Sequence, residues 1–171
     1  MNTEIRRKLE SAFSGLTVAV KEDSELVATT NKESVLSVLA YLKDAGYEHL
    51  ALVSCVDWIE EGQFELVYIL SSYTPNGKAY TGQEKLKLIV KARIPRDRPE
   101  FQTVTHIFAN AEPYERELHE LYGIRFEGHA RLVPLFLERA YEIPPFRKDF
   151  DTREYVEKTF GAIPAVEDQE C

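Results

Sequence analysis

The chain has 171 residues and a formal net charge of −8, with 44% hydrophobic and 29% charged residues. This composition is typical of a soluble globular protein with one full-sized core, and the acidic balance argues against nucleic acid as a main partner because phosphate binding needs a basic field. The longest apolar run, Leu50 to Val56, is far too short to span a bilayer, and no apolar segment follows Arg6 to Lys8 as it would in a secretory signal. We therefore expect a cytoplasmic protein, or one held on the cytoplasmic side of a larger assembly.

Two cysteines, Cys55 and Cys171, are too few to form a zinc site or to hold an iron–sulfur cluster alone. Cys55 lies in an apolar, strand-like run, which predicts a buried and unreactive thiol. The single Met, the few Asn and Gln residues and the abundant Glu, Lys and Arg residues favour a thermophilic source.

The spacing of apolar residues predicts a helix over 3–13, followed by a hairpin of two strands over 16–20 and 25–29. The stretch Thr30 to Glu33 matches a capping box, and the apolar run after it predicts a second helix that ends at Gly46.

Three further strands are predicted over 49–58, 64–71 and 84–94, with a loop over 73–83. The first of these is mostly apolar and is therefore expected at the centre of the sheet. Alternate lysines in the last of them indicate an edge strand or an exposed sheet face. A helix is then predicted over 100–109, with Phe101, Val104 and Phe108 directed inward.

These elements predict an α+β fold in which a mixed or antiparallel sheet carries helices packed on one face. We assign residues 1–130 to this body and residues 131–171 to an extended arm that ends in an acidic tail. Pro134 and the pair Pro144-Pro145 favour an extended path, and the arm has no room for a core of its own. Residues 163–171 are expected to be disordered.

The stretch Glu115 to His129 concentrates charged residues beside two glycines. Pro113 suits the first turn of a helix that Gly123 would end. One interpretation is a solvated helix with favourably placed charges. The other is a polar interaction surface in which Arg116 and the neighbouring carboxylates bind a partner.

No known catalytic or metal motif is complete in this sequence. His119 and Glu120 begin like the zinc motif HExxH, but Gly123 stands where the second His is required. Asp57 with Glu60 or Glu61 could form a catalytic carboxylate pair, but any acidic turn has the same appearance. We therefore predict no catalytic, cofactor-binding or metal-ligating residues.

Two motifs in the C-terminal half carry a family resemblance. The first comprises Glu115-Arg116-Glu117, Leu118, Glu120, Leu121, Gly123-Ile124, Phe126 and Gly128-His129, and the second is Pro145 to Phe150. Together they resemble the thirty-kilodalton (C) subunit of complex I, and their order and separation are much more specific than either motif alone. Departures from the family pattern occur at Pro113, Glu120, Ala130 and Val133-Pro134. They make the chain more similar to the corresponding subunits of archaeal membrane-bound [NiFe] hydrogenases and of the related sulfane reductase.

The resemblance implies a structural subunit without chemistry of its own, in the peripheral arm of a membrane-associated oxidoreductase of the ferredoxin-linked hydrogenase or sulfane reductase type. It implies a position on the cytoplasmic side of the cell membrane, with no membrane span and no cofactor in this chain. The implied partners are a hydrogenase-like large subunit, a small iron–sulfur subunit and antiporter-like membrane subunits. Iron–sulfur clusters, and in the hydrogenase type a NiFe centre, would lie in those partners. By carry-over, the partner interface comprises Glu115, Arg116, Glu117, Glu120, His129, Phe146, Arg147, Lys148 and Asp149.

Three alternatives stay open at this point. The chain could be the thirty-kilodalton subunit of an NADH or other donor:quinone oxidoreductase. It could be a stand-alone enzyme that uses Glu117, Glu120 and His129, which turnover by the isolated protein would reveal. It could also be a small adaptor unrelated to electron transfer, which a neighbouring gene for a hydrogenase-like large subunit would argue against.

Overall fold

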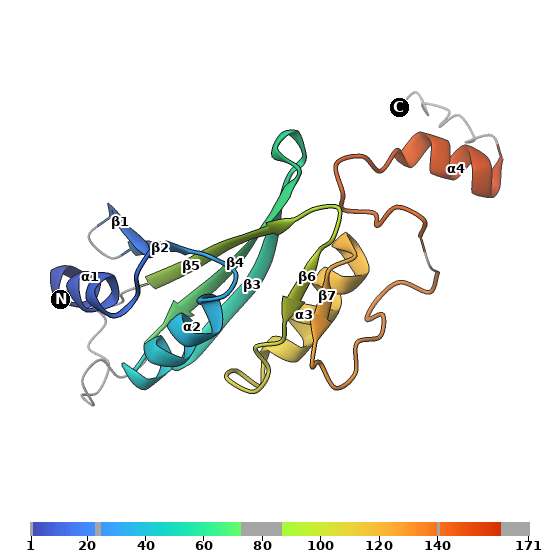
Figure 1. Cartoon of the computed structure of the whole chain (residues 1–171). Helices are drawn as coiled ribbons and strands as arrows, with labels where there is room; N and C mark the ends of the chain where they lie inside the picture. The colour runs from blue at the N-terminus through green and yellow to red at the C-terminus, as the bar shows by residue number, and fades with distance from the viewer. Residues whose placement is uncertain (1, 23–24, 73–86, 140, 162–171) are drawn as a thin grey trace, which may run out of the picture.

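The computed structural model describes residues 2–22, 25–72, 87–139 and 141–161. Their fold is α+β, as predicted, with a mixed five-stranded sheet and four α-helices (Figure 1). The elements in chain order are α1 (Asn2–Ala12), β1 (Thr17–Glu22), β2 (Glu25–Thr30), α2 (Val35–Asp44), β3 (His49–Trp58), the 3-10 turn η1 (Ile59–Glu61), β4 (Gln63–Ser71), β5 (Lys87–Pro95), β6 (Glu100–Gln102), α3 (Ala111–Tyr122), β7 (Arg125–Glu127) and α4 (Thr152–Phe160).

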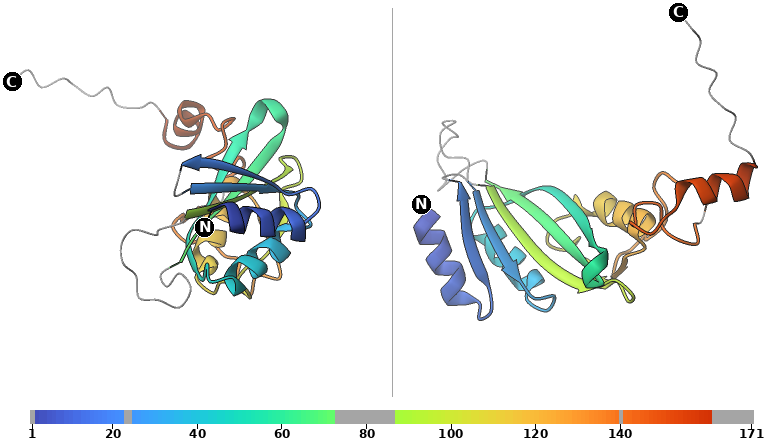
Figure 2. Two further views of the ribbon diagram at one scale, coloured as in Figure 1. Left: turned by 90° about the vertical axis from the view of Figure 1, so that its left-hand side faces the viewer. Right: turned by 90° about the horizontal axis from the view of Figure 1, so that it is seen from above.

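The main sheet has the strand order β1-β2-β5-β4-β3. Neighbouring strands are antiparallel except for β2 and β5, which run parallel. A second, two-stranded sheet joins β6 to β7 in parallel. Figure 2 shows α1 and α2 on one side of the main sheet and α4 well away from it.

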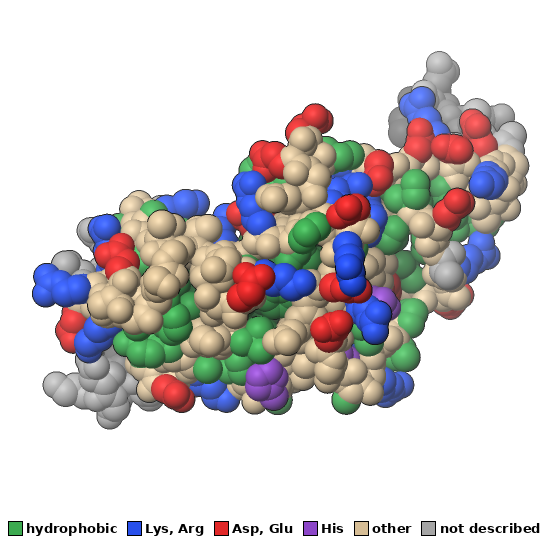
Figure 3. All heavy atoms as spheres, in the orientation of Figure 1, with side chains coloured by type: hydrophobic (Ala, Val, Ile, Leu, Met, Phe, Trp, Pro, Cys, Tyr) green, Lys and Arg blue, Asp and Glu red, His purple; other side chains and the backbone are tan. Residues whose placement is uncertain are grey.

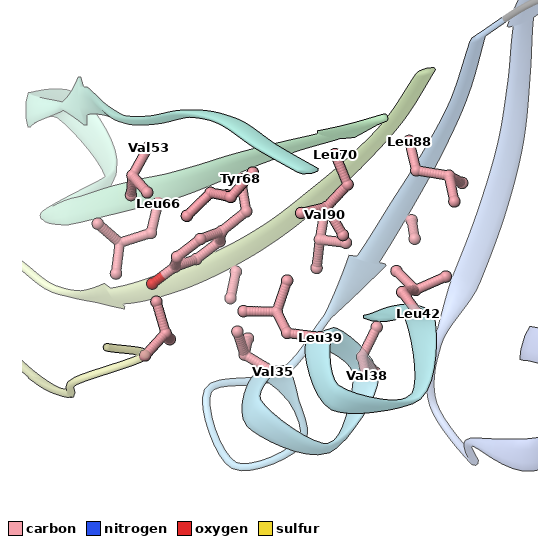
Figure 4. Close-up of a cluster of buried hydrophobic side chains, with 14 of the residues drawn as sticks. Val35, Val38, Leu39, Leu42, Val53, Leu66, Tyr68, Leu70, Leu88 and Val90 are labelled. Carbon is pink, nitrogen blue, oxygen red and sulfur yellow. The ribbon is translucent and has the colours of Figure 1, made fainter. Parts of the chain in front are cut away.

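The core lies between the sheet and α2 (Figure 4). Alternate residues of β4 point into it, as the period of two predicts, and the side chains of Phe64, Leu66, Tyr68 and Leu70 are completely buried. From α2, apolar residues at helical spacing face them: Val35, Val38, Leu39 and Leu42. Burying each such side chain contributes about 1.5–3 kcal/mol to the free energy of unfolding.

Several local predictions are confirmed. The first hairpin pairs β1 with β2, and Gly46, with a φ of +97°, follows the end of α2. The start of α2 differs from the predicted capping box, because Thr30 is the last residue of β2. Instead, the Ser34 amide donates a hydrogen bond to Oδ1 of Asn31 at 2.9 Å.

The predicted position of one strand within the sheet was wrong, because β3, expected at the centre, is an edge strand. β5 was expected at an edge or with an exposed face, and it lies between β2 and β4 with one face exposed, so the second option is confirmed. β3 carries apolar residues on both of its faces. One face packs on the core, and on the other Leu52, Val56 and Trp58 are partly exposed. The lysines of β5 lie on the outer face of the sheet, where Lys91 pairs with Glu65 at 2.8 Å.

The helix predicted over 100–109 was also wrong. Residues 100–102 form β6, whose Phe101 pairs with Phe126 of β7, and turns follow. The inward direction of Phe101, Val104 and Phe108 is confirmed, since all three are buried. The spacing of Phe101, Val104 and Phe108 therefore reflects their burial in a strand and a turn. Pairing with β7, which is distant in the sequence, makes residues 100–102 a strand.

The described residues of 131–150 form neither helix nor strand, but α4 breaks the extended path predicted within the arm over 131–171. Asp151 caps this helix, because its Oδ1 accepts the amides of Arg153 at 2.8 Å and Glu154 at 3.1 Å. We call residues 131–139 and 141–150 the arm. The predicted loop over 73–83, the first residues of the strand predicted from 84, and the tail over 163–171 lie outside the described residues.

Candidate partner-binding site

The site is built around α3, which carries most of the first motif. Its Leu118 and Leu121 face the core, and Pro113 lies in its first turn as predicted. Gly123 ends it with a φ of +75°, and its amide donates to the carbonyl of His119 at 2.9 Å. A Cβ at this glycine would lie 3.0 Å from Pro144 Cγ and from Arg147 Nη2. Position 123 therefore needs glycine both for its backbone conformation and for the close approach of the arm.

Glu115 points into the body, and its side chain is completely buried. Its carboxylate accepts hydrogen bonds from the Thr103 hydroxyl at 2.6 Å and from the Val104 amide at 2.7 Å. Burial raises the pKa of Glu115 to about 7 despite these two donors. The expected surface contact of Glu115 with a partner does not fit this position, because its carboxylate stabilises the turn after β6.

Arg116 and Glu120, one helical turn apart, hold the first half of the arm. Arg116 donates from Nε to the carbonyl of Val133 and from Nη2 to the carbonyl of Pro134, each at 2.9 Å. The Glu120 carboxylate accepts the backbone amides of Leu135, Phe136 and Leu137. One carboxylate that accepts several backbone amides is a strong anchor, because each of these hydrogen bonds is charge-assisted.

The second half of the arm is tied to the end of α3. The Phe146 amide donates to the carbonyl of Leu121 at 3.0 Å, and Arg147 Nε donates to the carbonyl of Tyr122 at 2.7 Å. The Arg147 guanidinium lies 5.2 Å from the centre of the Phe64 ring, within reach of a cation–π interaction. The second motif therefore uses its arginine within this chain.

A buried ion pair, which the sequence did not predict, fixes the end of the arm. Asp57 of β3 accepts Arg96 Nε at 2.9 Å, and its other oxygen accepts the Lys148 amide at 2.9 Å. Arg96 Nη2 also lies 2.5 Å from a carboxylate oxygen of Asp149. The hydrogen bond from Arg96 lowers the pKa of Asp149, and those to Asp57 and Asp149 raise the pKa of Arg96. The one signal in the sequence was Asp57 itself, the single charged residue of the apolar run from Leu50 to Trp58.

The remaining motif residues lie close by. His129 lies over the start of α3, with Nε2 3.4 Å from the Glu112 carbonyl, and its Nδ1 accepts the Arg131 amide at 3.1 Å. Glu117 is half-buried on α3, and the Lys148 side chain is exposed. His119, which begins the incomplete zinc motif, bonds through Nδ1 to the carbonyl of Ile124 at 2.8 Å.

Within the described ranges, no three His, Cys, Asp or Glu side chains gather as a metal ion would require. None of the helices in the described part combines the length and the apolarity that a membrane span requires. On the face in Figure 3, acidic and basic side chains are interspersed over β6, β7 and α3, which gives this region a mixed charged surface.

The sequence matches the family described as respiratory-chain NADH dehydrogenase, 30 Kd subunit, over residues 28–156. The chain belongs to this family, that of the thirty-kilodalton subunit of complex I-like respiratory oxidoreductases. It is therefore a subunit of an oxidoreductase complex, as the two motifs predicted.

Relatives within the thirty-kilodalton subunit family come from different kinds of enzyme. The C subunit of the F(420)H(2) dehydrogenase of Methanosarcina mazei is 38% identical over 126 residues, which cover 72% of this chain and 74% of the relative. The C subunit of the NADH-quinone oxidoreductase of Erythrobacter litoralis is 32% identical over 163 residues, which cover 94% of this chain and 61% of that protein. This chain thus spans less than two thirds of the length of the second relative.

A solved structure also resembles this thirty-kilodalton subunit closely in fold. It belongs to the membrane-bound sulfane sulfur reductase, an archaeal respiratory membrane complex. The two chains have a TM-score of 0.83 and 26% sequence identity, and the match covers 99% of this chain and 96% of the other. The near-complete coverage means that the match extends through the arm as well as the body.

Proposed function

We propose that this chain is a non-catalytic structural subunit in the peripheral arm of a membrane-associated complex of the ferredoxin-linked hydrogenase or sulfane reductase type. In this role it holds a hydrogenase-like large subunit beside a small iron–sulfur subunit, with antiporter-like subunits in the membrane. The observation that carries the proposal is the fold match over 99% of the chain to a subunit of an archaeal sulfane sulfur reductase. The chain would lie on the cytoplasmic side of the membrane, and the redox centres would lie in its partners.

The arrangement of the arm supports a scaffold role. Arg116 and Glu120 of the first motif bind backbone atoms of the arm, and Arg147 of the second motif binds the Tyr122 carbonyl at the end of α3. A segment that is held in place but lacks a core of its own is suited to lie between two proteins.

A second candidate is the thirty-kilodalton subunit of a donor:quinone oxidoreductase. It is favoured by the identity of 38% to a subunit of an F(420)H(2) dehydrogenase and of 32% to a subunit of an NADH-quinone oxidoreductase. Both candidates assign a scaffold role to this chain and differ in the electron donor and acceptor.

The test is a pull-down from native membranes in mild detergent through a tag at the N-terminus, with the partners identified by mass spectrometry. Recovery of a [NiFe]-type large subunit, a small iron–sulfur subunit and antiporter-like proteins is the expected result. Hydrogen evolution, sulfane reduction or quinone reduction by this material then decides between the two candidates. Recovery of the chain alone, together with turnover by the isolated protein, would contradict the scaffold role.

A further inference from the structure

The far end of the arm folds back on itself together with α4. The ring centre of Tyr141 lies 5.9 Å from that of Phe150 and 5.0 Å from that of Tyr155. The rings of Phe150 and Tyr155 are also in contact, with 5.5 Å between their centres. These contacts join the chain on both sides of the second motif, and we call residues 141–160 the distal unit.

The distal unit is held to the body by one short stretch. No residue of α4 is buried, and Figure 2 shows α4 well away from the main sheet. Among the described residues, the hydrogen bonds between the distal unit and the body all come from the stretch Phe146 to Asp149. Its first two residues bond to carbonyl groups at the end of α3, and its last two bond to the ion pair of Asp57 and Arg96.

Arg96 determines whether the charges at this contact attract or repel each other. Its Nη2 atom donates to Asp57 Oδ2 at 3.2 Å and to Asp149 Oδ1 at 2.5 Å. A carboxylate of β3 and a carboxylate of the distal unit therefore face each other across a single nitrogen atom. Only 15% of the Arg96 side chain is exposed, so water screens these charges less than it would on an open surface. Without the cation of Arg96, the two carboxylates would repel each other.

We propose that Arg96 is an electrostatic latch: when its contact with Asp149 breaks, the distal unit moves away from the body as one piece, while the first half of the arm stays bound to α3. We call the two arrangements closed and open. The first half has separate anchors, because Glu120 accepts the amides of residues 135–137 and Arg116 donates to the carbonyls of Val133 and Pro134. The inference concerns this chain alone and does not depend on the proposed function.

Opening would change the surface of the body at the end of α3. In the closed arrangement the Arg147 guanidinium lies 5.2 Å from the centre of the Phe64 ring, and the Phe146 ring meets Tyr122 edge-on at 6.0 Å. Both of these arm side chains belong to the distal unit and would leave with it. The rings of Phe64 and Tyr122 would then become more accessible, so the two arrangements present different surfaces.

The test measures the distance between the body and α4 in the full chain. Spin labels are attached to Ser37→Cys on α2 and Glu157→Cys on α4, both at exposed positions. The background is Cys171→Ser, and Cys55 stays unlabelled because it is buried. Double electron–electron resonance then gives the ratio of closed to open molecules. A second labelled pair, Glu142→Cys and Glu157→Cys, measures a distance inside the distal unit.

Asp149→Lys is the main variant, because it places a cation beside Arg96 and leaves the ion pair of Asp57 and Arg96 in the body intact. It should lower the ratio of closed to open molecules about tenfold or more, as loss of one charge-assisted hydrogen bond does. The distance inside the distal unit and the hydrogen exchange of amides 135–137 should not change. Glu138→Lys makes the same change of charge at an exposed position outside the distal unit and should keep the wild-type ratio.

A second comparison distinguishes a latch from an ordinary contact. Arg96→Gln should open the distal unit, because it leaves the carboxylates of Asp57 and Asp149 without a cation. Asp149→Asn should lower the ratio of closed to open molecules in the wild-type background, where it weakens the bond to Arg96. The same substitution should raise the ratio in the Arg96→Gln background, where it removes the repulsion.

Four results would overturn the inference. They are an open wild type, an unchanged ratio in Asp149→Lys, a change of the same sign for Asp149→Asn in both backgrounds, and a broadened distance inside the distal unit. If opening also speeds hydrogen exchange of amides 135–137, the arm detaches as a whole, and the two-part arrangement is refuted. A failed pull-down would refute the proposed function and leave this inference untouched, because the labelled chain is studied alone.

Discussion

The buried carboxyl group of Glu115 should give this protein an unusual dependence of stability on pH. Its pKa is raised from an ordinary 4.5 to about 7 because the side chain is completely buried. In the folded state it therefore holds its proton up to about pH 7, whereas in the unfolded chain it loses that proton near pH 4.5. The folded state binds more protons between these values, so the free energy of unfolding should fall as the pH rises through this window and level off above it.

The size of the change in the free energy of unfolding follows from the pKa shift of Glu115. Each unit of that shift corresponds to about 1.4 kcal/mol, which gives about 3 kcal/mol over the whole pH window. Replacement by Gln should remove this slope. The Gln side-chain oxygen can still accept the Val104 amide, and the Thr103 hydroxyl can donate to Thr105 Oγ1, 2.9 Å away. The assay is urea unfolding of the wild type and Glu115→Gln at constant ionic strength from pH 4.5 to 8, with Glu117→Gln as the control that keeps the wild-type slope. If the free energy of unfolding changes with pH in the same way in the wild type and in Glu115→Gln, the reasoning is refuted.

Three further predictions concern the arm and the core. Gly123→Ala should lower the free energy of unfolding by about 1–2 kcal/mol and speed hydrogen exchange in the arm. Gly15→Ala is the control, because Gly15 has a similar φ but a Cβ there would have nothing within 4 Å; it should lower the free energy of unfolding by about 1 kcal/mol and leave exchange in the arm unchanged. Equal hydrogen exchange in the two variants would contradict the steric argument. Asp57→Asn breaks a buried ion pair and should lower the free energy of unfolding by about 3 kcal/mol in urea, and a loss below about 0.5 kcal/mol would show that Asp57 does not hold the arm. Burial raises the pKa of the Cys55 thiol to about 12, so in a Cys171→Ser variant a disulfide reagent should label this thiol only after unfolding, and rapid labelling of the folded protein would contradict its burial.

Local sequence patterns predicted most of the helices and strands because periodicity reports which face of an element is buried. The inward positions of β4 and the end of α3 at Gly123 are examples. The order of strands could not be predicted, because it depends on pairings such as that of β2 with β5, which are far apart in the sequence. The same limit applies to residues 100–102, whose strand exists because Phe126 pairs with Phe101.

The sequence identified the two motifs but did not describe the contacts that they make. The two motifs lie side by side around α3, but the direction of their hydrogen bonds cannot be read from residue types. Glu120 could have bonded a partner as readily as the amides of 135–137. The sequence did not reveal that Asp57 and Arg96 belong to the site, because their ion pair links residues 39 positions apart. Asp57 also bonds a third segment, through the Lys148 amide of the arm.

The anchors of the arm also make its position depend on the folded body. Asp57 lies in β3, Glu120 lies in α3, and the Lys148 amide that completes the Asp57 contact comes 91 residues later. Because these anchors belong to the body, the arm keeps its position only while the sheet and α3 stay folded. A partner that binds the docked arm would therefore bind only subunits whose body is folded.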